Sequence, residues 1–492
     1  MINDMSKFPP FKHKIFPFKH QLEDLEYSKE RKDFALLHEM GCGKSKILLD
    51  TAQWLYLKGE IDGLLIVSDK GCFTSWEVDH IPAFWPEHLP FRAYTWQSYD
   101  TKKNTMKKEA ILRAQDNVFD FAMINIDALA TPKGKAFAAL FLQNHYAMMT
   151  VDESTSIKNI KAQRTKAAIG LGRLAEYRRI ITGTPIANRP LDCFAQFEFL
   201  RPGILGFTSY TAFKHTFAVL REVIMGNRRF EQIVGAKNTD LLRELIMPHS
   251  RRRLKKDCLD LPEKIYEIIY IEHTPEQARA YHDLKKYALH QFKEGLVTVD
   301  NALTLLMRLQ QINSGHLTAD DGSLVSIPSN RLSTLLQQLE ASDGKVVIWA
   351  KFREDIRQIM EALAHHYGPQ AAVHYYGETT SKERVEALAR FGHEDSCRFF
   401  VSNPTSGGKG LNDLVVSSDV IYYSNDWRLE ARLQSEDRNH RPGQRNNVTY
   451  RDFVVRGTVD SAILKAQRDK QDIANLVLTD ISQLFQSPDE LS

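Results

Sequence analysis

Cysteine is scarce in this chain, and long apolar runs are absent. The five cysteines are widely scattered and form no CxxC pair, at Cys42, Cys72, Cys193, Cys258 and Cys397. This spacing argues against a disulfide framework or a cysteine-rich zinc site and fits a reducing compartment. No apolar run approaches the ~18 residues that span a membrane, and Met1–Phe18 lacks the apolar core of a signal peptide. We therefore expect a protein that is neither secreted nor membrane-bound.

A strong charge imbalance is also absent. The 65 lysine and arginine residues nearly offset the 62 aspartate and glutamate residues, which leaves a formal net charge of +3. Binding to nucleic acid is therefore permitted, but a basic surface for it must be local. The 492 residues, of which 43% are hydrophobic, are enough for two or three globular domains of ~150 residues each.

The clearest motif follows a short apolar run near the N-terminus. The segment Gly41-Cys-Gly-Lys-Ser45 contains two glycines and precedes a predicted helix at Ile47–Tyr56. Glycines let backbone N–H groups close around an anion at a helix N-terminus, Lys44 can reach terminal phosphates, and the Ser45 hydroxyl can hold Mg²⁺. His38 occupies the position of the first glycine in the usual pattern. The alternative is a glycine-rich turn with a surface lysine.

Short apolar runs recur along the chain and alternate with helical segments. Four lie in the first half, at Leu64–Val67, Phe121–Ile124, Ala147–Val151 and Arg179–Thr182. Five follow in the second half, at Lys345–Trp349, Ala371–Tyr375, Arg398–Val401, Val420–Tyr423 and Val448–Val455. This alternation predicts two α/β lobes with parallel sheets covered by helices on both faces. Between the lobes, residues 201–260 have a helical and polar pattern, and helices continue to about His316 after a strand at Ile265–Glu272.

Two acidic residues directly follow the predicted strand Ala147–Val151. At a strand end beside a phosphate loop, Asp152 would hold Mg²⁺ and Glu153 would orient an attacking water. Thr182 ends the next strand and opens a Thr-Gly-Thr-Pro segment. That segment indicates either a loop that senses the phosphate or a plain turn.

The second half contains a glycine-rich loop and an arginine-rich segment. Lys409 is followed by Gly410 in place of a hydroxyl residue, so we interpret this loop as a phosphate contact and not as a second hydrolysis site. Arg438 and Arg441 are three apart, so they would share one face of a helix that Pro442 ends. Two such guanidinium groups suit the negative charge that develops on a γ-phosphate. A surface helix with salt bridges is the alternative.

The densest basic cluster is Arg251-Arg-Arg-Leu-Lys-Lys256. Charge runs of this kind often form solvated helix faces. A contact to a phosphate backbone or to a nucleotide is the alternative, and the cluster by itself does not decide between them.

In their order and spacing, these motifs resemble the Swi/Snf-like family of superfamily 2 helicase-related DNA-dependent ATPases, from about Phe18 to Leu476. The segments that carry the resemblance are His20-Gln21, Glu39–Ser45, Leu65–Trp76, Asn125, Asp127, Asp152–Thr155, Thr182–Asn188, Phe199–Gly203, Arg252–Pro262, Arg308–His316, Gly407–Asn412, Asp426-Trp427, Gln434–Gln444 and Gly457–Val459. Two positions depart from the family pattern. His38 replaces an aspartate, and Thr155 replaces a histidine that normally contacts the other lobe.

The resemblance implies a fold of two RecA-like parallel-sheet lobes with helical insertions. Lobe 1 would span residues 1–200, and helical insertions with a linker would span residues 201–325. Lobe 2 would span residues 326–478, followed by a tail at 479–492.

The resemblance also implies a site for ATP and Mg²⁺. The implied catalytic residues are Lys44, Asp152, Glu153, Arg438 and Arg441. The implied nucleotide-binding residues are Gln21, Gly41, Cys42, Gly43, Lys44, Ser45, Gly410 and Gln444. Ser45 and Asp152 would hold the metal. Contacts to nucleic acid, or coupling between the lobes, would come from Asn125, Thr182, Arg252 and Lys409.

The implied activity is ATP-dependent translocation on double-stranded DNA or its remodelling, with duplex or branched DNA as the preferred partner and RNA as an alternative. A strand-separating helicase on branched DNA or RNA, and a catalytically weak scaffold, stay open as other functions. The chain is short for this family. We therefore expect a monomeric motor of the viral or bacterial type, cytoplasmic in a bacterial host cell or a virus-infected cell. The sequence does not specify polarity, pathway or protein partners.

Overall fold

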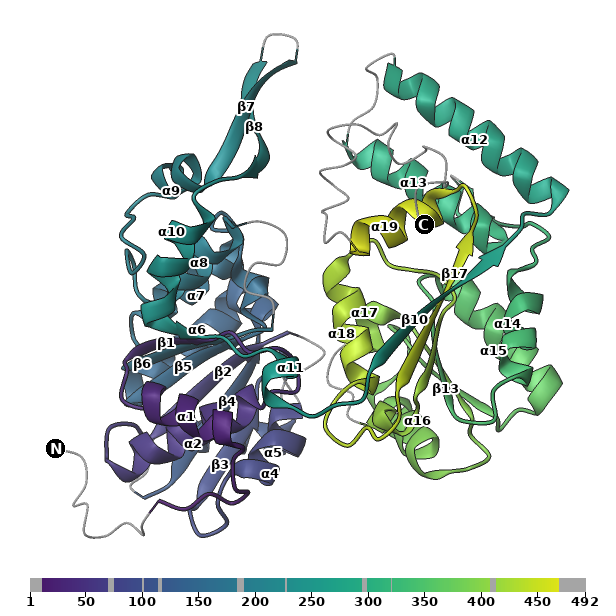
Figure 1. The fold of residues 1–492 in the computed structure, drawn as a ribbon. Helices are drawn as coiled ribbons and strands as arrows, with labels where there is room; N and C mark the ends of the chain where they lie inside the picture. The colour runs from purple at the N-terminus through teal and green to yellow at the C-terminus, as the bar shows by residue number, and fades with distance from the viewer. Residues whose placement is uncertain are drawn as a thin grey trace. The chain divides into compact units, whose positions relative to one another are not determined.

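The computed structural model describes residues 11–69, 75–99, 101–113, 117–183, 190–225, 228–293, 299–319, 321–407 and 413–468. The chain divides into two compact units, Met1–Leu259 and Asp260–Ser492. Figure 1 shows a sheet with surrounding helices in each unit. The segment that the sequence assigns to helical insertions is shared between them, because its part up to Leu259 belongs to the first unit and the remainder to the second.

The first unit is built on a seven-stranded sheet in the order β3-β4-β2-β5-β6-β1-β9, in which neighbouring strands are parallel. The strands are β1 Asp33–Leu36, β2 Gly63–Ser68, β3 Phe91–Thr95, β4 Phe119–Asn125, β5 Ala147–Asp152, β6 Tyr177–Ile181 and β9 Ser250–Arg251. All four strands predicted for the first half are confirmed, as β2, β4, β5 and β6. The edge strand β3 was not predicted.

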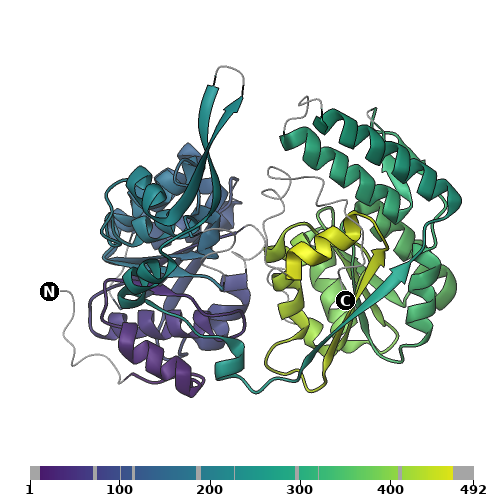
Figure 2. The ribbon, with the colours of Figure 1, turned by 45° about the horizontal axis from the view of Figure 1, so that its top comes forward.

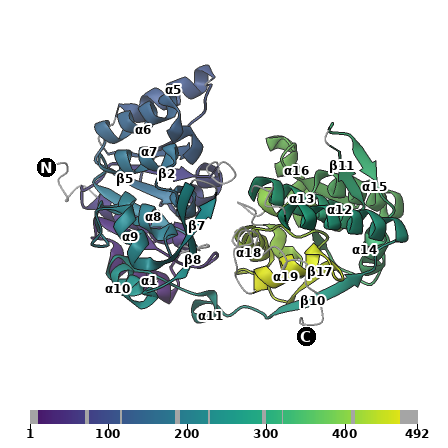
Figure 3. The ribbon, with the colours of Figure 1, turned by 90° about the horizontal axis from the view of Figure 1, so that it is seen from above.

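Helices cover both faces of this sheet because side chains alternate along its strands. In β1, Phe34 and Leu36 enter one apolar core, while Ala35 enters the other. The first core is covered by α1 Lys19–Ser28, α2 Lys44–Leu57 and α4 Ile81–Phe84, preceded by the π-helix η2 Trp76–His80. The second is covered by α5 Lys102–Leu112, α6 Pro132–Asn144, α7 Gln163–Gly172 and α8 Asp192–Leu200, of which α5, α6 and α7 lie side by side (Figure 3). Two short 3-10 helices, η3 Ile126–Ala130 and η4 Ser154–Ile157, follow β4 and β5.

The prediction of helices over residues 201–260 is partly wrong. Helices α9 Tyr210–Phe217, α10 Thr239–Ile246 and α11 Lys255–Cys258 form there, with a short 3-10 helix, η5 Met247–His249. Between α9 and α10, however, β7 Ala218–Met225 and β8 Arg228–Ala236 make an antiparallel hairpin that extends from the rest of the unit (Figures 1 and 2). The signal in the sequence is Gly226-Asn227 between two runs rich in β-branched residues, which is typical of a two-residue hairpin turn.

The second unit has a six-stranded sheet in the order β10-β17-β16-β13-β15-β14, again with parallel neighbours. The strands are β10 Lys264–Ile271, β13 Val346–Trp349, β14 Ala372–Tyr375, β15 Phe399–Ser402, β16 Asp419–Tyr422 and β17 Val448–Val455. All six were predicted, β10 as the strand Ile265–Glu272 and the other five from the apolar runs. Helices α14 Arg331–Glu340 and α15 Arg353–Tyr367 cover one face; α16 Ser381–His393 and α18 Leu429–Asn439 lie on the other, with α17 Pro404–Gly407 and η6 Asp413–Val416.

Three further helices share a smaller core in the second unit. Helices α12 Pro275–Lys293, α13 Val299–Ser314 and α19 Val459–Arg468 pack together through Tyr281, Leu309 and Val459, and Figure 2 shows α12 beside α13. The start of α12 is capped, because the Thr274 hydroxyl accepts a hydrogen bond from the Gln277 backbone N–H (3.2 Å). A two-stranded ladder, β11 His316–Thr318 with β12 Leu324–Ser326, follows α13.

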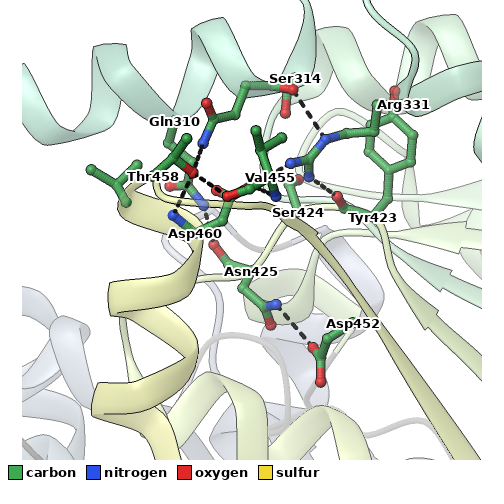
Figure 4. Close-up of polar contacts among 12 residues, drawn as sticks. Gln310, Ser314, Arg331, Tyr423, Ser424, Asn425, Asp452, Val455, Thr458 and Asp460 are labelled. Atoms are coloured by element: carbon green, nitrogen blue, oxygen red, sulfur yellow. Dashed lines mark hydrogen bonds and ion pairs between the residues drawn. The ribbon is translucent and has the colours of Figure 1, made fainter. Parts of the chain in front are cut away.

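A buried polar network fixes α13 and α19 to the strand ends of the second sheet (Figure 4). Arg331 bonds to the carbonyl of Tyr423 and to Asp460. Gln310 donates to the carbonyl of Asn425 (2.6 Å). The hydroxyl of Thr458 donates to the carbonyl of Val455 (2.7 Å), which fixes the start of α19. A hydrogen bond from the Asn313 amide to the Thr458 hydroxyl (2.8 Å) joins Arg308–His316 to Gly457–Val459, two of the segments that carry the resemblance.

Cys42, Cys193, Cys258 and Cys397 are free thiols. Within the described ranges, none of the helices combines the length and the apolar character needed to cross a bilayer.

Candidate functional site

Three loops of the first unit meet at one edge of its sheet. Leu36 of β1 lies level with Ile181 of β6, and Ile181 lies level with Asp152 of β5. Because these three strands are adjacent and parallel, the residues that follow them emerge side by side. The register therefore brings together the phosphate loop after β1, Thr182 after β6 and Glu153 after β5.

The phosphate loop has the backbone conformation that its glycines predict. Gly41 and Gly43 have φ angles of +84° and +81°, a region that side-chain-bearing residues rarely adopt. Gly43 is the residue before α2, which begins at Lys44. The first N–H groups of a helix have no partner within the helix, so the start of α2 is suited to bind a phosphate.

Lys44 and Cys42 have different roles in this loop. The ammonium of Lys44 donates hydrogen bonds to the backbone carbonyls of His38 (2.8 Å) and Glu39 (3.3 Å), so the lysine lies along the loop that precedes it. Burial raises the pKa of the Cys42 thiol to about 11, with a smaller opposing effect of Lys44. Cys42 is therefore a protonated packing residue that contributes backbone atoms to the loop.

Gln21 contacts the phosphate loop from α1. Its amide nitrogen donates to the carbonyl of Cys42 (3.4 Å), which also contacts Nε2 of His20 (3.0 Å). A Cβ atom at Gly43 would lie 1.9 Å from the Gln21 amide nitrogen. The φ angle requires glycine at position 43, and a Cβ there would also displace the Gln21 amide.

The carboxylate of Asp152 is oriented by three donors. Its Oδ2 accepts hydrogen bonds from the indole of Trp76 (2.9 Å) and the hydroxyl of Ser68 (3.4 Å), and Oδ1 accepts one from the backbone N–H of Glu153 (3.0 Å). Burial raises the pKa of this carboxyl. The hydrogen bond from Trp76 and the charge of Lys44 act in the opposite direction and lower the pKa, but by less. A cation bound here would stabilise the ionised carboxylate.

Glu153 is held in an unusual backbone conformation beside Thr182. Its φ angle is +51°, and its side chain is 8% exposed. The hydroxyl of Thr182 donates to Oε2 of Glu153 (3.3 Å). A Cβ atom at Gly183 would lie 3.4 Å from Cγ of Met40, so the segment after β6 packs against the phosphate loop. Thr182 therefore connects the acidic pair to that loop.

The donor set in the first unit fits Mg²⁺ bound together with a nucleotide. Among the residues that the structure describes, no group of three or more His, Cys, Asp and Glu side chains could hold a metal. Mg²⁺ at a nucleotide does not need such a group, because phosphate oxygens and water supply most of its ligands. The Asp152 carboxylate and the Ser45 hydroxyl at the start of α2 suit that mode of binding.

The predicted polymer contacts of the first unit lie on different elements, and one of them, Arg252, belongs to the basic cluster. Asn125 ends β4, and its side chain accepts a hydrogen bond from the Asp127 backbone N–H (2.7 Å). Asp127 forms an ion pair with Arg164 (2.7 Å). Arg252 is exposed and directly follows β9.

In the second unit, the prediction that Arg438 and Arg441 share a helical face is wrong. Helix α18 ends at Asn439, and His440 leaves the helical conformation with φ −100° and ψ 81°. Arg438 is a buried residue of the last turn, whereas Arg441 lies beyond the helix. The physical reason is that a proline disfavours the helical conformation of the residue before it, so the helix ends earlier than the spacing suggests.

Buried ion pairs fix α18, the helix that carries Arg438. Arg432 bonds to Glu436 (2.7 Å) and to both carboxylate oxygens of Asp452 on β17. Lys264 of β10 also bonds to Glu436 (2.9 Å). Burial alone would raise the pKa of Glu436, but Arg432 and Lys264 outweigh burial and lower the pKa to about 2. Helix α18 is therefore bonded to two strands of its sheet through charged groups.

Gln444 holds the loop after α18. Its amide nitrogen donates to the carbonyls of Val415 (3.0 Å), Ser417 (3.1 Å) and Asn439 (3.2 Å), and its oxygen accepts from the N–H groups of Arg445 and Asn446. The structure thus places Gln444 in a backbone-supporting role. Lys409, Gly410 and the segment 184–189 after Gly183 lie outside the described residues.

Sequence reasoning missed two charged residues that support this site, Asp24 and Arg253. Arg253 donates from Nε and Nη2 to the Asp24 carboxylate (2.9 and 2.8 Å). The basic cluster pointed to this region, but no sequence pattern indicates that its third arginine pairs with an acid on α1.

A family model of the SNF2-related domain matches residues 20–316, more than half of the chain. The chain belongs to the SNF2-related family. A second family model, the helicase conserved C-terminal domain, matches residues 330–443. Together with the parallel sheets of both units, these matches confirm the predicted Swi/Snf-like, two-lobe α/β fold. We refer to the unit Met1–Leu259 as lobe 1 and to the unit Asp260–Ser492 as lobe 2 of this SNF2-related core.

Two relatives with similar sequences are much longer than this SNF2-related chain. Transcription regulatory protein SNF2 of Saccharomyces cerevisiae is 27% identical over 470 residues, which cover 90% of this chain and 26% of the relative. An uncharacterized ATP-dependent helicase of Mycoplasma pneumoniae is 22% identical over 462 residues, which cover 92% of this chain and 41% of the relative. The chain thus spans less than half the length of either relative.

A solved structure, the SWI2/SNF2 ATPase core of Sulfolobus solfataricus in complex with double-stranded DNA, aligns with 97% of this chain and 98% of its own. The sequence identity is 23% and the TM-score is 0.43.

Proposed function

We propose that this SNF2-related core is an ATPase that depends on double-stranded DNA and uses ATP hydrolysis to translocate along the duplex or to remodel it. The observation that supports this best is the edge of the lobe 1 sheet, where the phosphate loop, Thr182 and the pair Asp152–Glu153 meet. Membership of the SNF2-related family supports DNA as the polymer.

In lobe 1, we assign to each residue the role that the resemblance to the family implies. Gln21 reads the adenine, and the N–H groups of Gly41–Ser45 with Lys44 bind the phosphates. Ser45 and Asp152 hold Mg²⁺, which neutralises phosphate charge when it is bound. Glu153 orients the attacking water, and its contact with Thr182 fixes the carboxylate for that task.

Lobe 2 completes the site in this proposal. Arg438 and Arg441 supply positive charge to the γ-phosphate as it leaves, which is the arginine-finger role. The charged bonds of Arg432 support this assignment, because a helix held to two strands can present a guanidinium group with little disorder. Closure of the lobes on ATP and their opening after hydrolysis would move the core along DNA.

Polymer contacts come from both lobes in this proposal, through Asn125, Thr182, Arg252 and Lys409. We further propose a monomeric cytoplasmic motor, with branched DNA or RNA as other substrates.

The test is ATP hydrolysis with no polymer, and with duplex, single-stranded and forked DNA and RNA. We expect duplex DNA to stimulate hydrolysis most. Triplex displacement without strand displacement on a fork supports translocation, whereas efficient strand displacement indicates a strand-separating helicase. ATPase activity that ignores every polymer would contradict the proposal.

A further inference from the structure

Arg253, near the end of lobe 1, is bonded to helix α1 through the buried carboxylate of Asp24. Asp24 on α1 is 0% exposed and receives two hydrogen bonds from Arg253, at 2.9 and 2.8 Å. Arg253 also pairs with Glu23 of the same helix (2.9 Å). Such two-point contacts between a guanidinium group and a carboxylate fix orientation as well as distance.

The same carboxylate contacts the phosphate loop. Nε2 of His38 lies 3.2 Å from Oδ2 of Asp24, and both side chains are fully buried. The carbonyls of His38 and its neighbour Glu39 accept the hydrogen bonds of the Lys44 ammonium. Asp24 therefore connects Arg253 to the backbone on which Lys44 rests.

Backbone bonds hold the outgoing segment along the loop. The N–H of Leu37 donates to the carbonyl of Arg251 (2.8 Å), and the N–H of Glu39 donates to the carbonyl of Arg253 (2.9 Å). The Glu39 carboxylate accepts a hydrogen bond from the N–H of Lys255 (2.7 Å). The segment 251–255 is thus fixed to the loop residues on either side of His38.

Asp24 lies three residues after Gln21 on α1, so the two side chains lie on neighbouring positions of one helix face. Gln21 packs on Gly43 with little space, since a Cβ there would clash at 1.9 Å. A rotation of α1 would therefore alter the contact between the Gln21 amide and the carbonyl of Cys42.

We propose that Asp24 and Arg253 are positioning residues that hold Gln21 and the phosphate loop in one arrangement, and thereby set the affinity for ATP and its preference over GTP. This inference rests on the proposed function. It explains why a basic cluster that resembles a polymer contact directs its third arginine inward, against an acid.

A purely structural ion pair is the competing explanation, and lobe 1 offers a matched control. Arg92 on β3 donates from Nε to Asp120 on β4 (2.7 Å) and makes a second bond from Nη2 (2.5 Å). Asp120 is also 0% exposed, and the side-chain exposures of Arg92 and Arg253 are similar, 20% and 27%. The described contacts of the Arg92 pair involve neither Gln21 nor the phosphate loop.

The experiment compares Arg253→Gln, Arg253→Lys and Arg92→Gln in the full chain. Melting temperature, kcat, and the KM values for ATP and GTP are measured for each. We expect both glutamine variants to lower the melting temperature. Arg253→Gln should in addition raise the KM for ATP on the order of 10-fold, with little change in kcat, and reduce the preference for ATP over GTP. Arg253→Lys keeps one charged bond and should restore part of the preference.

A second comparison uses Gln21→Ala. If the arginine acts through Gln21, Arg253→Gln should cause no further loss of ATP preference in the Gln21→Ala background. The inference is overturned if Arg253→Gln changes KM and base preference no more than Arg92→Gln does. A wild-type chain that neither binds nor hydrolyses ATP would instead contradict the proposed function.

Discussion

Glu153 combines a strained backbone with a buried, oriented carboxylate. Its φ angle of +51° costs free energy that the surrounding structure must offset. Strained backbone of this kind is often found at functional sites. We expect Glu153→Gln to reduce single-turnover ATP hydrolysis by ~10²–10⁴-fold, because the amide cannot act as a base. Affinity for a fluorescent ATP analogue should stay near the wild-type value. A variant that loses binding instead would show that Glu153 holds the loop.

His38 predicts how the stability of lobe 1 depends on pH. Burial lowers the pKa of His38 below 6.5, although Asp24 opposes that effect. The unfolded chain therefore binds more protons between the lowered pKa of folded His38 and the ordinary value of 6.5, so the free energy of unfolding decreases as the pH falls from about 7.5 to about 5.5.

The check on this prediction compares the free energy of unfolding of the wild type with that of His38→Gln at each pH. The contributions of the other titrating groups largely cancel in the difference. The free energy of unfolding should decline less steeply in the variant over that pH window. Equal slopes for the two proteins would contradict the assignment.

Several site residues could be predicted from sequence because their motifs are local. Lys44, Asp152, Glu153 and Thr182 each follow an apolar run that does form a strand, and parallel strands bring their ends to one edge. The pairing of Asp24 with Arg253 could not be predicted, because 229 positions separate them and charge patterns do not identify partners.

At the scale of elements, the packing of α18 on its sheet depends on the ion pairs of Arg432. This side chain is 5% exposed and bonds to Glu436 and Asp452, which are also buried. Removal of one member of such a network leaves uncompensated charge, so we expect Arg432→Ala to lower the free energy of unfolding of lobe 2 by ~3–5 kcal/mol. Arg432→Met, which retains most of the apolar volume, should be tested beside it in denaturant titrations. A loss of stability below ~1 kcal/mol in Arg432→Ala would contradict this account.

The prediction of elements succeeded where burial dominates the pattern. Runs such as Val346–Trp349 are buried on both faces, so they could be identified as central strands of a parallel sheet. The edge strand β3 and the hairpin β7–β8 carry mixed polar and apolar residues, and helical periodicity competes with alternation there. Helix α18 ends at Asn439, earlier than its sequence pattern predicts, because Pro442 disfavours the helical conformation before it.

At the scale of the whole molecule, a formal net charge of +3 means that DNA binding must come from local basic groups. Contacts to phosphates release counterions, so affinity for duplex DNA should fall steeply with salt, by ~10²-fold or more between about 50 and 200 mM for several contacts. The DNA concentration that half-saturates the ATPase measures this. Arg252→Ala should weaken binding and make it less dependent on salt, whereas an unchanged salt dependence would remove Arg252 from the interface.

The central claim is that the phosphate loop of lobe 1 hydrolyses ATP in response to duplex DNA. The most direct measurement is the steady-state ATPase rate of the wild type and of Lys44→Ala, with and without duplex DNA, after both are shown to be folded. We predict strong stimulation of the wild type by duplex DNA and no measurable hydrolysis by Lys44→Ala in either condition. Hydrolysis that persists in Lys44→Ala, or a wild-type rate that duplex DNA does not change, would contradict the account.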